Sequence, residues 1–168
     1  MLGVEYLRKR IGYVPQDSLF FEDTIINNVL LDIQIEQGIV EEKSKKIDLS
    51  DEIENMAGGW NTVLNFGTTN ISGGQKKRID LLRVFLRKFD VLIFDESTAS
   101  LDVDRRKLLF EYIDTIKKEK IIIFITHNME ECEHFDTIFT IADKRIVTVQ
   151  KENMKKDYKI VDNRKTNY

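Results

Sequence analysis

The hydrophobic pattern between residues 71 and 102 predicts a helix followed by a buried strand. Apolar residues at positions 81, 82, 85 and 86 recur at helical spacing. The basic residues of this segment fall on the other helical faces: Lys76, Lys77, Arg78, Arg83, Arg87 and Lys88. The next apolar run, residues 91–94, has no alternation with polar residues. Such a run is typical of a strand covered on both faces of a parallel sheet.

Shorter patterns predict the elements that precede this segment. Residues 11–14 are typical of a strand, ended by Pro15. Asp23 or Thr24 is a suitable N-cap for a helix after it. Residues 32–56 are polar with helical charge spacing, because acidic residues precede lysines by four positions. We expect short exposed helices there.

The pattern after residue 102 predicts a second helix and a second buried strand. Residues 103–119 form an amphipathic pattern with an apolar stripe of Leu108, Leu109, Tyr112, Ile113 and Ile116. Residues 121–125 are all apolar, residues 129–134 suggest a short helix, and residues 137–150 alternate as a hairpin. Strands alternating with helices predict an α/β fold with a largely parallel sheet.

Composition is that of a soluble globular domain. The chain has 168 residues, of which 42% are hydrophobic and 33% charged. Its net charge of −3 leaves no basic footprint, so nucleic acid is not favoured as a partner. The single Cys132 excludes an internal disulfide. The longest apolar run, residues 121–125, is too short to cross a bilayer. Residues 151–168 contain more basic than acidic residues and few apolar ones, so we expect a loosely ordered tail.

Two segments carry candidate chemistry. Asp95 and Glu96 follow a buried strand, where open α/β sheets place their ligands, and adjacent carboxylates suit a divalent cation and a positioned water. Ser72, Gly73 and Gly74 open a helix. Helix N-termini attract phosphate, and the two glycines allow an anion to approach the backbone closely.

The same segments resemble motifs of the nucleotide-binding domain of ABC transporters. ISGGQ at 71–75 resembles the signature LSGGQ, VLIFDE at 91–96 resembles the Walker B strand with its catalytic glutamate, and ASLD at 99–102 resembles the D-loop. VPQD at 14–17 resembles the Q-loop. FFEDTIINNV at 20–29 resembles the stretch that follows the Q-loop in exporters. The order and spacing of the first three, the signature, the Walker B strand and the D-loop, make the resemblance specific.

This resemblance implies a set of catalytic roles with ATP and Mg²⁺ as cofactors. Asp95 is expected to hold Mg²⁺ through its water shell, and Glu96 to orient or deprotonate the water that attacks the γ-phosphate. Gln16 is expected to reach both metal and water and to sense the membrane domain. His127 is expected to bind the γ-phosphate.

The resemblance also implies a dimer. In the family, the signature turn closes over ATP held by a second nucleotide-binding domain. Ser72, Gly73, Gly74 and Gln75 are therefore expected to bind nucleotide across the dimer, with Asp102 at the seam. The other implied partners are the transmembrane domains of an exporter, which places the chain at the cytoplasmic face of the cell membrane.

The chain departs from the family pattern chiefly in two places, besides Ile71 in place of the signature leucine and the absence of the aromatic residue that stacks on adenine in the family. No G-x-x-x-x-G-K-S/T sequence occurs, so the P-loop that cradles phosphates is missing. The loop at 62–67 lacks the acidic residue that exporters carry there. The resemblance thus covers residues 6–149 but only the later part of the domain. We expect residues 1–150 to form a partial P-loop NTPase-like ABC ATPase domain, with a helical subdomain near 24–90.

Three functional hypotheses remain. The first is a fragment of an exporter-type ABC ATPase, supported by the intact Glu96 and His127. The second is a non-hydrolysing regulatory subunit that supplies its signature turn in trans. The third is a soluble ABC ATPase of translation or DNA repair, which the exporter-like stretch at 20–29 and the acidic balance disfavour. We favour the fragment.

Overall fold

The computed structural model describes residues 3–65, 70–142 and 144–149. The chain forms two compact units, Met1–Ile125 and Thr126–Tyr168, which are described separately. The first contains a parallel sheet with its helices, and the second contains a short helix and a hairpin.

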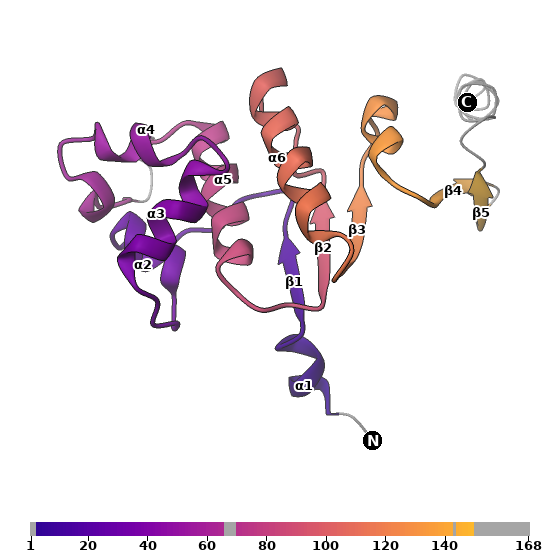
Figure 1. Ribbon diagram of the computed structural model, residues 1–168, viewed down its shortest axis with the longest axis horizontal. Coiled ribbons are helices and arrows are strands. Elements are labelled where there is room, and N and C mark those ends of the chain that lie inside the picture. The colour runs from indigo at the N-terminus through magenta and orange to yellow at the C-terminus, as the bar shows by residue number, and fades with distance from the viewer. Residues whose placement is uncertain (1–2, 66–69, 143, 150–168) are drawn as a thin grey trace. The chain divides into compact units, whose positions relative to one another are not determined.

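The first unit is built on a three-stranded parallel sheet (Figure 1). Its strands are β1 (Ile11–Val14), β2 (Val91–Asp95) and β3 (Ile121–Ile125), in the spatial order β1-β2-β3. Phe94 of β2 pairs with Val14 on one side and Phe124 on the other. The expected α/β class with a parallel sheet is confirmed.

Helices fill the two crossovers between these strands. The helical elements of the unit are α1 (Val4–Arg8), α2 (Ile25–Leu30), α3 (Gln37–Lys45), α4 (Ser50–Glu54), η1 (Gly59–Asn61), α5 (Gly73–Phe85) and α6 (Val103–Ile116). The N-cap of α2 is Thr24, whose hydroxyl accepts the Asn27 N–H at 3.2 Å, as the sequence suggested. The short helix α1 was not anticipated.

One face of the sheet is packed beneath α5 and α6. The Phe94 ring lies 6.4 Å from Phe85 of α5, and the Phe124 ring lies 5.5 Å from Phe110 of α6. Gly12 belongs to this face, and a Cβ there would sit 2.5 Å from the Phe89 ring. Only glycine fits at that point without displacing the ring.

The stripe predicted for α6 is partly correct. Leu109 and Ile113 are buried, whereas Leu108, Tyr112 and Ile116 are half-buried. Phe110, which the prediction omitted, is buried because its ring reaches the β3 side of the sheet.

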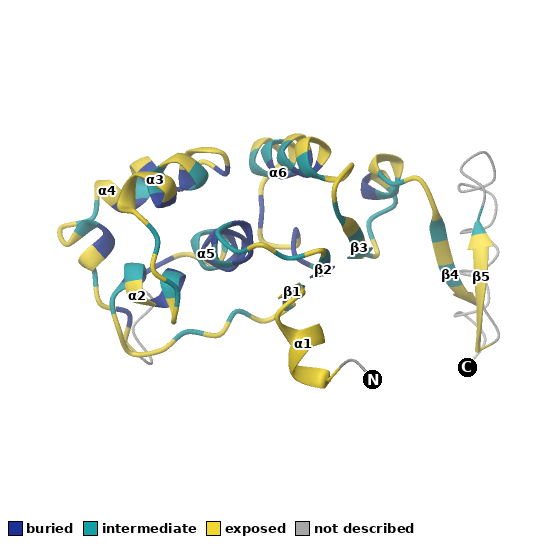
Figure 2. Cartoon of the chain, turned by 60° about the horizontal axis from the view of Figure 1, so that its bottom comes forward, coloured by how far each residue is buried: buried dark blue, intermediate teal, exposed yellow. Residues whose placement is uncertain are grey.

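The opposite face of the sheet is open, which corrects one prediction. Tyr13, Ile121, Ile123 and Ile125 are 51%, 63%, 45% and 48% exposed, and the same side of β2 is only half-buried. Figure 2 colours the chain by burial, with exposed residues in yellow. The sequence predicted the strand at 91–94 to be covered on both faces and the strand at 121–125 to be buried. Their apolar runs suit two covering layers, but α5 and α6 supply only one.

A second correction concerns the basic residues of α5. Lys77 and Arg78 were assigned to the outer faces, yet they are only 4% and 2% exposed. Their aliphatic stems pack inside, while their cationic ends hydrogen-bond to backbone and carboxylate oxygens of other segments. Spacing along the helix alone does not reveal such partners.

The second unit contains η2 (Met129–His134) and an antiparallel hairpin of β4 (Ile138–Ala142) and β5 (Arg145–Val149). The predicted short helix is a 3-10 helix, and the predicted hairpin is confirmed. The expected tail, residues 151–168, lies outside the described residues. Among the described residues, none of the helices has the length and apolar character that a membrane crossing needs.

The open face should make the isolated chain self-associate. Lysines at positions 121 and 123 (Ile121→Lys with Ile123→Lys) should weaken this association about tenfold or more, a change of about 1.4 kcal/mol, because they remove apolar area that association buries. Sedimentation velocity across a concentration series measures it.

A matched control is Val103→Lys, since Val103 is equally apolar and 75% exposed but lies on α6. It should leave association unchanged. A wild-type chain that stays monomeric and melts cooperatively at high temperature would contradict the prediction.

Candidate functional site

Polar side chains meet at the carboxyl ends of β1 and β2. The Gln16 amide Nε2 donates to Glu96 Oε2 at 3.0 Å, and the Tyr13 hydroxyl donates to Asp95 Oδ2 at 2.8 Å. These partners are 80 and 82 residues apart in sequence. They meet because the two strands are adjacent and parallel, so both chains leave the sheet at the same edge.

Glu96 has an unusual backbone conformation. Its φ angle is 43°, in the left-handed region that residues other than glycine adopt at a cost of roughly 1–2 kcal/mol. The Glu96 N–H donates to the Ile125 carbonyl at 2.9 Å, which fixes the turn to the end of β3. Backbone strain of this kind tends to persist at functional positions.

Tyr13 was missed by sequence reasoning. It lies in register with Ile93, so Asp95, two residues further along β2, shares its face. The hydrogen bond to Asp95 raises the pKa of Tyr13, with smaller contributions from burial and from the Asp95 charge. The alternation of side chains between the two faces of β1 was the available signal. The sequence alone, however, does not give the register of β1 against β2, and so not the contact between Tyr13 and Asp95.

Lys77 of α5 holds the Q-loop-like segment in place. Its Nζ donates to the carbonyl oxygens of Pro15 at 2.6 Å and Gln16 at 2.8 Å. Burial lowers the pKa of Lys77, and the charges of nearby carboxylates, led by Asp80, oppose that shift. The backbone around Gln16 is therefore anchored to the helix that begins at the signature-like turn.

The donor set at the strand ends suits magnesium. Asp95 and Glu96 offer carboxylate oxygens and Gln16 an amide oxygen, and Mg²⁺ is commonly bound through one or two carboxylates, water and substrate phosphates. Within the described residues, no group of three or more His, Cys, Asp and Glu could enclose a metal. An ion here would thus depend on water and phosphate for most of its shell.

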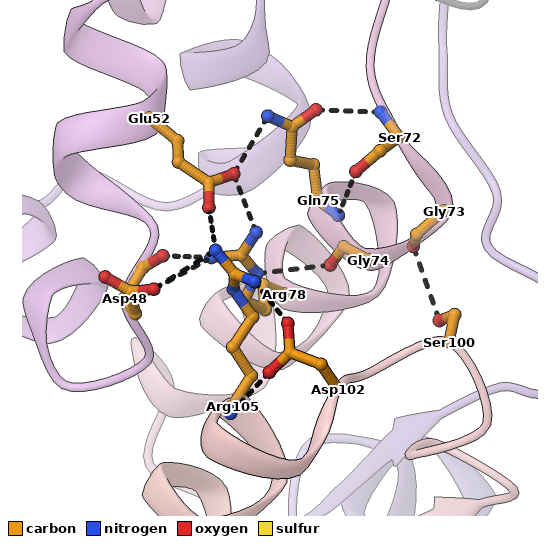
Figure 3. A network of polar contacts seen from close by, with 10 residues as sticks. All are labelled: Asp48, Glu52, Ser72, Gly73, Gly74, Gln75, Arg78, Ser100, Asp102 and Arg105. Carbon is orange, nitrogen blue, oxygen red and sulfur yellow. Dashed lines mark hydrogen bonds and ion pairs between the residues drawn. The ribbon is translucent and has the colours of Figure 1, made fainter.

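The signature-like turn is a capping box at the start of α5 (Figure 3). The Gln75 N–H donates to the Ser72 hydroxyl at 3.1 Å, and the Ser72 N–H donates to Gln75 Oε1 at 2.7 Å. The two glycines between them, Gly73 and Gly74, begin the helix. A 13-residue helix places partial positive charge at this end, which suits an anion.

The D-loop-like segment lies against this turn. The Ser100 hydroxyl is 3.4 Å from the Gly73 carbonyl oxygen, and a Cβ on Gly74 would be 3.1 Å from the Ser100 carbonyl. Asp102 caps α6 by accepting the Arg105 N–H at 2.9 Å. That bond, with the Arg105 guanidinium, lowers the pKa of Asp102.

His127 belongs to the second unit, where a small turn surrounds it. The Thr126 hydroxyl donates to Glu131 Oε2 at 2.5 Å and accepts the Asn128 N–H at 2.9 Å. The Asn128 side chain caps η2 at the Glu130 N–H. His127 itself is exposed, and its role at a phosphate stays a prediction.

Comparison with known proteins identifies the family. The sequence model described as ABC transporter matches residues 3–99, more than half of the chain. The chain belongs to the ABC transporter family.

Relatives of this ABC chain include putative multidrug export ATP-binding/permease proteins of Staphylococcus aureus. Those of strain NCTC 8325 / PS 47 and of the bovine strain RF122 / ET3-1 are each 33% identical over 143 residues. Each alignment covers 84% of this chain and 25% of the relative, so the chain spans about a quarter of their length.

A solved structure has the same fold. A bacterial Atm1-family ABC exporter with ATP bound superposes with a TM-score of 0.85 at 25% identity, covering 98% of this chain and 30% of that one. The ABC exporter fold expected from the motifs is therefore confirmed. The individual roles of the site residues remain predictions.

The predicted residues of this ABC chain fall into three groups. Gln16, Asp95 and Glu96 lie together at the strand ends. The signature residues and Asp102 lie together at the N-termini of α5 and α6. His127 lies in the second unit. Sequence reasoning did not identify Tyr13, Glu52, Lys77 and Arg105 as residues that contact these sites.

Replacing Lys77 should destabilise the ABC chain. In Lys77→Met the Pro15 and Gln16 carbonyls lose their donor, and we expect the free energy of unfolding to fall by about 1–3 kcal/mol. Urea denaturation at low protein concentration, followed by the fluorescence of the buried Trp60, measures this change.

The control is Lys76→Met, one position earlier on the same helix and half-buried. It keeps the hydrogen bonds from Lys77 to the Pro15 and Gln16 carbonyls, and it should lower the free energy of unfolding much less. Equal losses for both variants would rule out the anchoring role.

Proposed function

We propose that this chain is the ATP-hydrolysing part of an exporter-type ABC transporter and couples hydrolysis to transmembrane export. The observation that carries the proposal is the Gln16–Glu96 contact beside Asp95 at the strand ends. It joins three residues from separate motifs in the place where α/β sheets bind ligands.

In the proposed reaction, Glu96 is the group that acts on water. Its carboxylate orients the attacking water or takes its proton, and the Gln16 amide fixes the position of that carboxylate. Asp95, held by Tyr13, would carry the Mg²⁺ water shell. When bound, the metal would neutralise charge on the phosphates. His127 would donate to the γ-phosphate.

The proposed site is completed by a second nucleotide-binding domain. The Ser72–Gln75 turn would present its backbone N–H groups to ATP held by that partner, with Asp102 at the seam. The S. aureus relatives combine ATP-binding and permease parts in one protein. We infer that transmembrane domains are partners here too, at the cytoplasmic face of the membrane.

In this proposal the P-loop comes from another segment. The sequence contains no G-x-x-x-x-G-K-S/T, and the open face with Tyr13 and Ile123 lacks a covering layer among the described residues. A segment with a phosphate-binding loop and an apolar helix, packed on this face, would supply both. The lack of the motif also favours a second candidate, a non-hydrolysing subunit that lends only its signature turn.

Calorimetry of the chain alone with Mg-ATP tests whether the chain forms only part of an ATP site. We expect no binding at millimolar nucleotide, because backbone cradling of the phosphates is missing. Saturable binding that Asp95→Ala abolishes would mean that the chain forms a phosphate site without a P-loop. The proposal that the chain forms only part of an ATP site would then be wrong.

Turnover separates the two candidates. In the assembled transporter, Glu96→Gln should lower ATP hydrolysis about 10²–10⁴-fold, as expected for loss of a general base, while ATP binding persists. Glu119→Gln, on an exposed residue after α6, is the matched control. Hydrolysis near the wild-type rate in Glu96→Gln would place the base elsewhere or favour the non-hydrolysing subunit.

A further inference from the structure

Glu52 of α4 receives hydrogen bonds from two other helices (Figure 3). Its Oε2 accepts the Gln75 amide Nε2 at 2.9 Å and Arg78 Nη2 at 2.7 Å. Its Oε1 accepts Arg105 Nη2 of α6. One carboxylate therefore joins α4 to both the signature helix and the D-loop helix.

The contact with Gln75 sets the orientation of that amide. A glutamine amide offers one oxygen acceptor and one NH₂ donor. Because Nε2 is directed to Glu52, Oε1 is left to accept the Ser72 N–H at 2.7 Å. Glu52 thus holds the Gln75 amide in the orientation in which its Oε1 accepts the Ser72 N–H, one of the two bonds of the capping box.

Charge explains why a carboxylate is needed at this position. The Arg78 side chain is only 3% exposed, so its cation requires a partner inside the protein. Burial by itself would raise the pKa of Glu52, but the hydrogen bonds from Arg78 and Gln75 and the charges of Arg78 and Arg105 outweigh it and lower the pKa. Glu52 is consequently ionised at neutral pH.

The same network reaches the D-loop. Arg105, while bound to Glu52, also pairs with the Asp102 carboxylate and lies 3.3 Å from Asp48 Oδ2. Asp102 and the turn at Ser72–Gln75 are the two parts proposed to face the partner domain. Both are attached to α4 through Glu52.

We propose that Glu52 is a positioning residue that holds the Ser72–Gln75 turn in its anion-accepting form and in fixed relation to Asp102. The inference rests on the proposed function, in which this turn closes on ATP of a second domain. Glu52 touches no nucleotide itself and acts through Gln75 and Arg105.

The positional part is tested on the full chain without nucleotide. Hydrogen exchange, read by mass spectrometry on peptides spanning 70–76, reports the Ser72 N–H. Glu52→Met should add about one early-exchanging amide to this peptide, since it removes both acceptor oxygens and opens the box. Glu52→Gln keeps one acceptor oxygen and should exchange between wild type and Glu52→Met.

The matched control is Asp51→Asn, which removes the neighbouring carboxylate on α4 and should leave exchange at 70–76 as in wild type. The positional role would be overturned if the peptide 70–76 exchanged equally in wild type and Glu52→Gln while Glu52→Met was either unchanged or unfolded.

The functional part is tested on the assembled ATPase. Glu52→Gln should lower kcat/KM for ATP about tenfold at a temperature where the variant is still fully folded. Its melting temperature should fall, because the buried Arg78 loses a charged partner. Asp51→Asn should match wild type in both measurements. The inference would be overturned if the wild-type assembly hydrolyses ATP and the Glu52→Gln assembly is equally active. A wild-type assembly without hydrolysis would instead overturn the proposed function, while the exchange data still decide whether Glu52 sets the turn.

Discussion

Cationic side chains on helix α5 and just after it link the first unit by donating hydrogen bonds to backbone carbonyls of the surrounding segments. Lys77 binds the residues after β1, and Arg78 binds the Asp48 carbonyl before α4. Near the end of the helix Arg83 donates to the Leu19 carbonyl, and Arg87, two residues after α5 ends, donates to the Leu30 carbonyl. Hydrogen bonds from charged donors are stronger than neutral ones, and each one here closes a long loop. The loops between β1 and α5 therefore take their positions from α5.

This arrangement gives the two candidate sites a common support. α5 begins at the Ser72 capping box, and one turn later Lys77 reaches the segment of Gln16. The strand-end cluster and the signature-like turn are thus both linked to α5, although they are proposed to act on different nucleotides. A displacement of α5 would move both of them together.

The sequence was most informative where local chemistry decides the structure. The strand at 11–14, the Thr24 cap, the helix from Gly73 and the hairpin in the second unit follow from alternation, capping and helical periodicity. The motifs also indicated the family, because several short patterns occur in a fixed order.

The sequence was least informative where a residue depends on a distant partner. Lys77 and Arg78 read as surface cations until their acceptors, 26 to 62 residues away, are known. Glu52 has no local signal either, since its three donors come from α5 and α6. The exposure of β3 was missed for a different reason. An apolar run shows that its side chains favour burial, but it does not show how many layers of the protein are available to cover them.

The left-handed backbone at Glu96 sets stability against chemistry at a single residue. A glycine there would relieve the strain at φ 43° and would favour folding. It would also delete the carboxylate that faces Gln16. Selection for stability alone therefore favours a substitution that the proposed reaction cannot accept, which makes position 96 a place where the two demands can be separated by mutation.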